Sequence, residues 1–318
     1  MERKEAIRPS ANRPVLVNDA ATAHPPFASG SGTTVIPQIG GAGCGCQAGA
    51  QAEGEAAGPP GYIFAIGRIE ARFPSLGVEK EFAQATGRAD AGGLTDQQAL
   101  AKVLAQPENR YLARQVCWVM SIEGLETYIL VPRDPAGLDL LLASVRDNPG
   151  RLDIDVVIGL RGPIATADMC NGLLLPLVVF DQIYSFDREA LISAIPAPRA
   201  RMAAKDEKQF RTAAGDLFDR ITQLTDNAGA TDEHRALNYL AVRYPLIYGR
   251  ATEQYERNYS LDGVETRPSR LSGVRNVVDV IFSFADRNTT AVEKYFVRVD
   301  VTEEFPFLVS PLQPFYER

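Results

Sequence analysis

An α+β fold in two lobes is predicted by three observations along the 318-residue sequence. Stretches rich in β-branched and aromatic residues, around Tyr62, Val116 and Val277, are typical of strands. Other segments place apolar residues at helical spacing, which is typical of amphipathic helices. Two long segments of this kind precede a β-rich end. We therefore expect mixed strands with short helices first, followed by two long helices packed on an antiparallel sheet.

The first 60 residues differ in composition from everything that follows. They are rich in Gly, Ala, Pro and Ser and contain one aromatic residue, Phe27. Such a segment buries too little apolar surface to offset the entropy lost on ordering. The sequence therefore predicts a disordered arm over 1–60, a first lobe over 61–195 and a second lobe over 205–318, joined by a linker.

The first half of the first lobe is predicted as one strand, three helices and a hairpin. The stretch YIFAIGRIEARF is expected to be a strand, and a helix should follow it and end near Gly87. Thr95 and Gln98 form the capping box of the next helix. A short helix is expected over 107–114. The strands VCWVMSI and ETYILVP should form a hairpin that turns at Gly124.

The second half of this lobe continues the alternation. Asp134 is expected to cap the helix AGLDLLLASVR, with Pro135 in its first turn. A strand is predicted over 152–160. The apolar stretch GLLLPLVVFDQIYSF should form one or two buried strands with a break at Pro176. Asp187 should cap the short helix that closes the lobe.

The second lobe begins with two long helices. The first is expected over 207–226, and Thr231 or Asp232 should cap the second, which Pro245 should kink. VVDVIFSFADRN and VEKYFVRVDVTEEF alternate and predict a long antiparallel hairpin. The proline-rich C-terminal tail should be extended, either across its own domain or on a partner.

The charge balance excludes several classes of partner. The net charge is −7, and Lys and Arg are scattered among Asp and Glu, so we expect no nucleic acid and no anionic membrane as partner. The longest apolar run, 172–180, is too short to span a membrane. The charged N-terminus does not resemble a secretory signal. A cytoplasmic location with reduced thiols is therefore expected.

Five long stretches resemble one known family. They are YIFAIGRIEARFPSLGVEKEFAQATGR, NRYLARQVCWVMSIEGLETYIL, TDEHRALNYLAVRYP, RPSRLSGVRNVVDVIFSF and EKYFVRVDVTEEFPFLV. They are similar to the C-terminal region of the PatG-type cyanobactin maturation proteases, and the PatA-type proteases carry a related region. The resemblance covers 61–318. In that family the region follows a subtilisin-like domain and is described as a domain of unknown function.

The resemblance implies a pathway and not a reaction. The family's proteases cleave or macrocyclise ribosomally made peptides, but we find no counterpart of their subtilisin-like domain here. The histidines are His24 and His234, and no serine has the glycine-rich setting of a subtilisin nucleophile. Protease activity is therefore not expected. The resemblance implies a non-catalytic accessory or recognition module in the biosynthesis of ribosomally synthesised, post-translationally modified peptides.

The cysteines and histidines provide weak candidates for a metal site. Cys44 and Cys46 form a C-x-C pair, which is not the zinc-knuckle spacing, and two thiols in a glycine-rich tail explain it as well as metal capture or a peptide mimic do. Cys117 is expected to be a small buried hydrophobe. No phosphate loop or dinucleotide fingerprint is present, so no cofactor other than zinc is considered.

Cys170, Asp168 and His234 are the candidate zinc ligands in the ordered region. They support the alternative function, a stand-alone zinc-dependent hydrolase or metal-stabilised enzyme that acts on a precursor peptide. His234 could instead be a general base, or simply an exposed histidine in the first turn of a helix. For His234 we favour the exposed first-turn histidine, because its acidic neighbours suit the start of a helix.

Two arginines are candidates for peptide binding. Arg267 and Arg270 lie in RPSRLSG, where a guanidinium could bind a peptide carboxylate or an acidic leader, although a plain loop explains them too. The expected partners are a precursor peptide, a peptide-modifying enzyme, or a second copy of this chain in a homodimer. The acidic pair Glu303-Glu304 is expected to be solvated.

Overall fold

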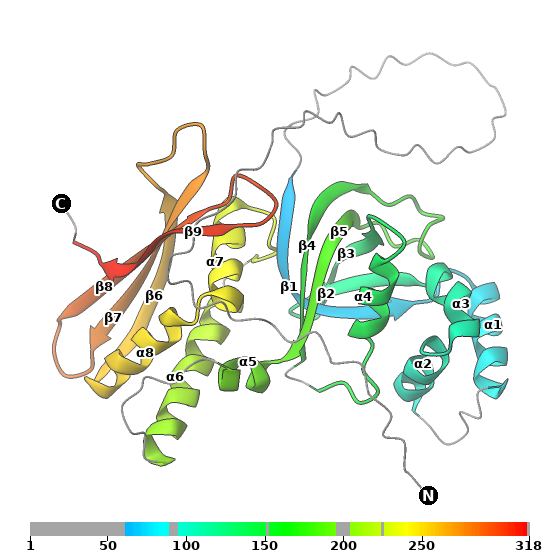
Figure 1. Ribbon diagram of the computed structural model, residues 1–318, viewed down its shortest axis with the longest axis horizontal. Coiled ribbons are helices and arrows are strands. Elements are labelled where there is room, and N and C mark those ends of the chain that lie inside the picture. Colours follow the sequence, from blue (N-terminus) through cyan, green and yellow to red (C-terminus); the bar gives the residue numbers. More distant parts are fainter. Residues whose placement is uncertain (1–60, 89–94, 151–152, 195–203, 224–225, 317–318) are drawn as a thin grey trace, which may run out of the picture. The chain divides into compact units, whose positions relative to one another are not determined.

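The structure is a computed structural model that describes residues 61–88, 95–150, 153–194, 204–223 and 226–316. The arm predicted over 1–60, with Cys44 and Cys46, lies outside the described residues. Most of the linker expected between the two lobes also lies outside them. Within the described residues the chain forms two sheets and the helices that pack on them, which confirms the α+β class (Figure 1).

The first five strands close into a barrel. They are β1 (Tyr62–Arg72), β2 (Cys117–Ile122), β3 (Leu125–Pro132), β4 (Asp153–Ile164) and β5 (Pro176–Asp187). Their order is β1-β2-β3-β5-β4, with β4 returning to β1. The neighbours β3 and β5 are parallel, and all other neighbours are antiparallel. A helix, α4 (Gly137–Ser144), connects β3 to β4. Together these features are the topology of an OB-type barrel.

Strand β1 reaches both sides of the closure because it changes partner in the middle. Residues 62–67 pair with β4, and residues 68–72 pair with β2. Gly67 lies where the change occurs. A Cβ atom there would be 2.4 Å from the carbonyl oxygen of Ser121, so glycine allows the two backbones to approach this closely.

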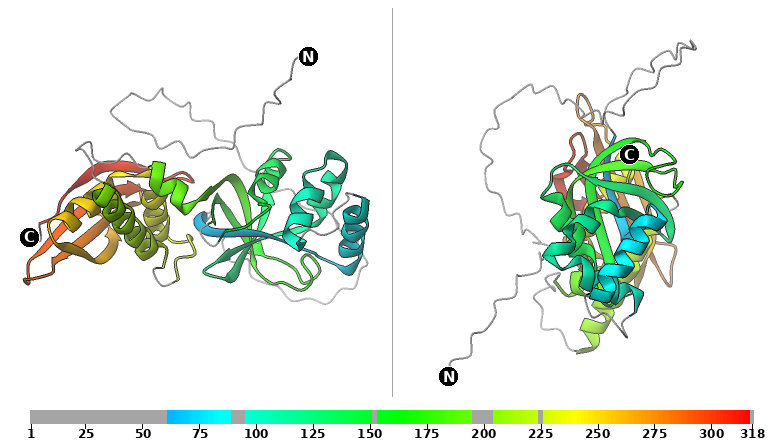
Figure 2. Two further views of the ribbon diagram at one scale, coloured as in Figure 1. Left: turned by 90° about the horizontal axis from the view of Figure 1, so that it is seen from below. Right: turned by 90° about the vertical axis from the view of Figure 1, so that its right-hand side faces the viewer.

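A helical insertion separates β1 from β2. It contains α1 (Leu76–Arg88), α2 (Asp96–Leu104), the 3-10 turn η1 (Pro107–Asn109) and α3 (Arg110–Gln115). The predicted capping box is confirmed, because the Thr95 hydroxyl accepts from Gln98 N–H while the Gln98 side chain accepts from Thr95 N–H. The three α-helices form one group beside the barrel (Figure 2). Phe82, Val103 and Leu112 join them to the barrel core.

The rest of the chain is a second sheet with helices on one face. The helices are α5 (Arg188–Ala194), α6 (Ala204–Thr222), α7 (Asp232–Arg243) and α8 (Leu246–Glu256). The strands are β6 (Tyr259–Pro268), β7 (Val277–Asp286), β8 (Val292–Asp300) and β9 (Phe307–Pro314), all antiparallel in that order. Figure 1 shows α6, α7 and α8 beside this sheet.

The predicted hairpin and helices are confirmed with two differences. The hairpin is β7–β8, but β6 and β9 flank it, so its edges are already paired. The tail is therefore an edge strand of its own sheet. The second long helix is two helices, because Pro245 separates α7 from α8. Proline lacks the N–H that a continuous helix needs at this point.

Two main clusters of buried side chains hold the fold. The barrel interior draws its buried members from the span between Ile63 and Ile183. The larger cluster joins α6–α8 to one face of the second sheet, and it also includes residues on the outside of the barrel: Phe64, Ile66, Ile154, Val156, Ile158 and Phe186. The helices are thus packed between the sheet and the barrel wall.

A polar contact fixes this packing between α7 and β1. The buried Asn238 side chain donates to the Phe64 carbonyl at 2.8 Å, and its amide pairs with that of Asn227. Phe64 N–H donates to the Gly229 carbonyl at 3.0 Å. Gly229 has φ +71°, and a Cβ atom there would meet the Phe64 oxygen at 2.3 Å, so a side chain is excluded.

None of the helices in the described part of the chain combines the length and the apolar character that crossing a membrane requires.

Candidate functional site

The second sheet has one face on the helices and one face turned away from them. Val280, Phe282 and Val297 belong to the cluster shared with the helices. Side chains alternate between the two faces of a strand. The residues between them therefore lie on the opposite face, which we call the outer face. From their register its members include Arg267, Asp279, Ile281, Ser283, Lys294, Phe296, Arg298 and Phe315, and the exposed Glu265 opposite Ile281.

Arginines and phenylalanines are stacked across the outer face. The Arg298 guanidinium lies 4.8 Å from the ring centroid of Phe296. Phe296 meets Phe315 edge to face, with 5.7 Å between centroids. Arg267 lies 4.8 Å from the centroid of Phe315. Each ring therefore holds a guanidinium group in place through the ring quadrupole.

Arg267 differs from the other stacked arginines of this region in its charge partner. Arg298 is paired with Asp279, with 3.0 Å between Nε and Oδ1. Arg275 lies over Phe307 and is 2.5 Å from Asp300. In the described part of the chain, Arg267 has no carboxylate partner. Its guanidinium is held by a ring, is exposed, and keeps its N–H donors available for a carboxylate.

A shallow hollow lies beside the stacked rings. Its volume is about 590 Å³, and it is lined by Asp262, Ser283, Val292, Lys294, Phe315 and Tyr316. Phe315 thus contacts Arg267 and also borders the hollow. A ligand with a carboxylate and a neighbouring apolar group could use both features.

Arg267 and Arg270 lie in different elements, so the plain-loop interpretation of RPSRLSG does not hold for both of them. Arg267 lies in β6, directly before Pro268 ends the strand. Arg270 lies in the following loop and is exposed. β6 was not predicted as a strand, because it has little apolar alternation of its own. Its pairing with β7 makes this segment a strand.

The candidate zinc ligands Cys170, Asp168 and His234 are not brought together. Within the described ranges, no group of three or more His, Cys, Asp or Glu side chains could hold a metal ion. The Cys170 sulfur is bonded to that of Cys117, and Asp168 is exposed in the same loop as Cys170.

His234 lies in the first turn of α7, as predicted, but it is half-buried and not exposed. Burial lowers the pKa of His234, although the nearby Glu233 and Asp226 oppose this effect. Burial therefore favours the neutral form of the imidazole. The interpretation of His234 as an exposed histidine is therefore wrong, because the side chain is half-buried.

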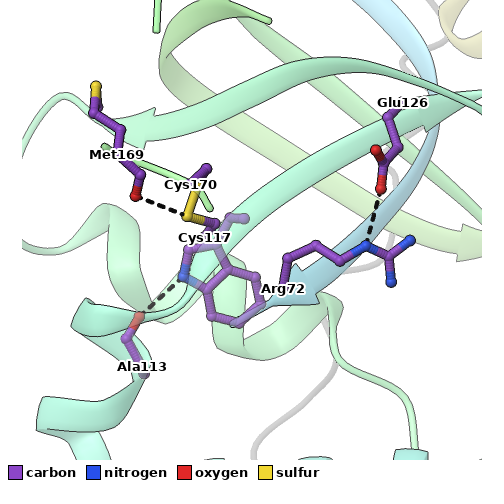
Figure 3. The surroundings of a disulfide bond; sticks show 7 residues. Arg72, Ala113, Cys117, Glu126, Met169 and Cys170 are labelled. Carbon is purple, nitrogen blue, oxygen red and sulfur yellow. Dashed lines mark hydrogen bonds and ion pairs between the residues drawn. A yellow bond between two sulfur atoms is a disulfide. The ribbon is translucent and has the colours of Figure 1, made fainter. Parts of the chain in front are cut away.

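The disulfide corrects the expectation that these thiols are reduced and separate (Figure 3). Cys117 is buried in β2, as expected, but its sulfur is joined to Cys170, which is 53 residues away. The loop between β4 and β5 folds back onto β2 and brings the two sulfurs together. No local pattern signals this contact, because it depends on where a loop of the closed barrel comes to rest.

A carboxyl pair was also missed. Glu304, expected to be solvated, has a side chain that is 14% exposed and lies 3.4 Å from Arg133, which also pairs with Asp181 at 2.8 Å. Burial, and after it the hydrogen bond with Asp181 and that group's charge, together raise the pKa of Glu304 to about 7, against the opposing effect of Arg133. The run Glu303-Glu304 at a strand end is the only sequence signal for this pair, and it indicates solvation as readily.

The fold and the outer face together define an α+β protein with an OB-type barrel and an open, helix-backed sheet. Residues 204–315 match the family model described as PatG C-terminal. The chain therefore contains a PatG C-terminal-type domain, as the resemblance predicted.

A solved structure described as "PatG Domain of Unknown Function" is similar over 80% of this chain and 98% of its own length, with a TM-score of 0.66 and 20% identity. At this identity the likeness shows the fold. The curated proteins include no match to the chain.

Proposed function

We propose that the chain is a recognition module that binds a peptide on the outer face of its C-terminal sheet, in the biosynthesis of ribosomally made, post-translationally modified peptides of the cyanobactin type. A peptide carboxylate binds Arg267, and an adjacent apolar or aromatic side chain enters the hollow beside Phe315. The peptide is a precursor peptide or a segment of a modifying enzyme. We place this binding in the cytoplasm, where ribosomal peptides are made.

The observation that carries the proposal is the stacked guanidinium of Arg267, which pairs with no carboxylate among the residues that the structure describes. A ring fixes its position at 4.8 Å, so little side-chain entropy remains to be lost when it binds. A bidentate contact with a carboxylate is the geometry that guanidinium groups favour. The neighbouring Arg298 is neutralised by Asp279 and therefore cannot take this role.

The order of the strands limits where a bound peptide could pair with the C-terminal sheet as an additional strand. The β7–β8 hairpin cannot accept a strand, since β6 and β9 cover both of its sides. The remaining edges are β6 and β9, and Pro311 and Pro314 in β9 lack N–H donors. The outer face is therefore the better surface for a peptide.

Titration calorimetry with the full chain tests this proposal. The probes are an acidic peptide that carries an aromatic residue next to a carboxylate and the same peptide with its acidic residues changed to amides and its C-terminus amidated. We expect Arg267→Ala to raise Kd about 10- to 100-fold, because a charge-assisted hydrogen bond contributes about 1.5–3 kcal/mol. The amidated peptide should lose as much affinity for the unmodified chain.

Arg287→Ala is the matched control. Arg287 is an exposed arginine that is also stacked on a ring, 4.6 Å from the centroid of Tyr255 of α8, on the helix side of the sheet. Its loss should leave Kd unchanged. Equal effects of the two substitutions, or tight binding of the amidated peptide, would contradict a carboxylate site at Arg267. Sedimentation of the same samples tests whether the chain forms the homodimer that is one of the partners expected from the sequence.

The zinc-dependent alternative is not proposed here. Its three candidate ligands do not meet, and the sulfur of Cys170 is already bonded to Cys117.

A further inference from the structure

The loop between β4 and β5 covers the outward side of β2 and β3. Residues 165–175 form this loop, which we call the cover loop. Val119 of β2 and Ile129 of β3 are buried beneath it, at 0% and 3% exposure. The members of this separate apolar cluster are Cys117, Val119, Ile129, Ala165 and Cys170, with Leu173, Leu175 and Leu177 packed against them.

The cover loop is attached to the barrel in only two ways that the described residues show. One is the disulfide from Cys170 to Cys117, beside which the Cys117 sulfur also lies 3.4 Å from the Met169 carbonyl oxygen (Figure 3). The other is apolar contact. The backbone hydrogen bonds of its amides stay within the loop, for example from Ala165 N–H to the Leu175 carbonyl at 2.8 Å and from Gly172 N–H to the Ala167 carbonyl at 2.8 Å. The loop is therefore a unit that can leave without breaking a strand ladder.

The covered surface is the one that ligands use in this class of barrel. In OB-type barrels, the face of strands 2 and 3, together with the loop between strands 4 and 5, binds extended polymers. A cavity of about 610 Å³ lies beside the disulfide, and Met169 and Cys170 of the cover loop form part of its wall with Trp118, Ile129 and Leu138. Displacing the loop would open this cavity and expose Val119 and Ile129.

We propose that the β2–β3 face is a binding site for an apolar peptide segment, that the cover loop occupies it, and that the Cys117–Cys170 disulfide locks it closed. A dithiol reductant opens the lock. The reductant supplies two electrons and two protons, the sulfur–sulfur bond of the protein breaks, two thiols form, and the reductant becomes a disulfide. The site is separate from the outer face and from Arg267.

The side chains of the cover loop indicate what kind of ligand can replace it on the β2–β3 face. Leu173 and Leu175 lie against Val119 and Ile129, so a replacement must present apolar side chains from an extended backbone. A nucleic acid strand is disfavoured by the net charge of −7. The sequence of the cover loop itself, ATADMCNGLLL, is the reference for what this face accepts.

Hydrogen exchange followed by mass spectrometry tests the lock. Peptide mapping after thiol alkylation first shows whether Cys117 and Cys170 are joined in the isolated full chain. We expect dithiothreitol to accelerate exchange of the amides in 165–175 at least about tenfold, while amides of the five barrel strands keep their protection. The variant Cys117→Ser with Cys170→Ser should reproduce this without reductant. Loss of protection throughout the barrel would overturn the proposal, because the disulfide would then hold the whole fold.

A peptide supplied in trans tests the site. The probe is a fluorescein-labelled peptide with the sequence of 165–175 and serine in place of Cys170. Fluorescence anisotropy should show binding to the reduced chain at least about tenfold tighter than to the oxidised chain. A control peptide with aspartate in place of Leu173 and Leu175 should not bind. A labelled oligothymidine of similar length provides the comparison with nucleic acid.

Two further variants separate the effect of the cover loop from that of the disulfide and of the outer face. Leu175→Asp weakens the apolar contact of the cover while both cysteines remain, and it should increase probe binding to the reduced chain by several-fold. Arg267→Ala should leave probe binding unchanged, so failure here is distinct from failure of the outer-face proposal. Equal probe binding in both redox states, or preference for the oligothymidine, would overturn the inference.

Discussion

The barrel and the C-terminal sheet bury their side chains in different ways. The barrel closes on itself, and every buried member of its interior lies between Ile63 and Ile183. The sheet is open, and the cluster on its inner face includes Phe64, Val156 and other residues on the outside of the barrel. The region that matches the PatG C-terminal family thus completes its core with residues from the preceding part of the chain. This difference predicts that the C-terminal sheet is the less independent of the two regions.

Arg235 provides the strongest test of this dependence. Its side chain is 3% exposed, its guanidinium lies over Tyr62 of β1, and its Nη1 donates to the Val301 carbonyl at 2.6 Å. Arg235→Met removes these donors and leaves carbonyls after β8 without partners. We expect the free energy of unfolding to fall by about 3 kcal/mol in urea denaturation. Hydrogen exchange should show that β6–β9 lose more protection than β1–β5.

The exposed Arg220 is the matched control for Arg235, because it also lies on a helix and bonds a backbone carbonyl, that of Asp262 at 3.4 Å. Arg220→Met should cost less than about 0.5 kcal/mol. If Arg235→Met weakened both regions equally, the two would form one cooperative unit and the contrast between them would not hold.

Asn238 tests the same boundary with a neutral group. It is fully buried and bonds the Phe64 carbonyl and the Asn227 amide. Asn238→Ala leaves both partners buried and unsatisfied, so we expect a loss of about 2 kcal/mol in urea denaturation. Asn148→Ala, which removes an exposed bond to Gln98, serves as the control and should have little effect. A loss below about 0.5 kcal/mol at Asn238 would show that water takes over its role.

The pair of carboxyl groups formed by Glu304 and Asp181 tests the contact between the two regions through the pH dependence of stability. Glu304, after β8, has a pKa raised to about 7 by burial and by its contact with Asp181 of the barrel. A group whose pKa is higher in the folded state than in the unfolded state stabilises the fold at low pH, and this stability is lost as the pH rises. The contribution should therefore decline from about pH 5 to about pH 8 as Glu304 ionises beside Asp181.

We expect about 1–2 kcal/mol for this decline, less than the full shift implies because the group is coupled and partly solvated. Thermal unfolding across this pH range measures it, and Glu304→Gln should flatten the profile. Glu303→Gln is the neighbouring control. A profile that keeps its slope in Glu304→Gln would assign the dependence to other groups.

Much of the secondary structure was predictable because its signals are local. The Thr95 capping box, the turn at Gly124 and the interruption at Pro245 each depend on residues within a few positions of one another. The alternation in β7 and β8 predicted their hairpin for the same reason. The strands β6 and β9 were missed because their apolar alternation is weak, and pairing with β7 and β8 supplies what their own patterns lack.

The sequence by itself determined the α+β class, most of the helices and strands, and the two arginine candidates. The tertiary structure alone decided the barrel closure, the disulfide between Cys117 and Cys170, the meeting of Asp181 with Glu304, and the stacking of Arg267 on Phe315. Each of these depends on contact between segments that lie tens of residues apart in the sequence. Periodicity and capping describe interactions over a few residues, so they carry no information about which distant segments meet.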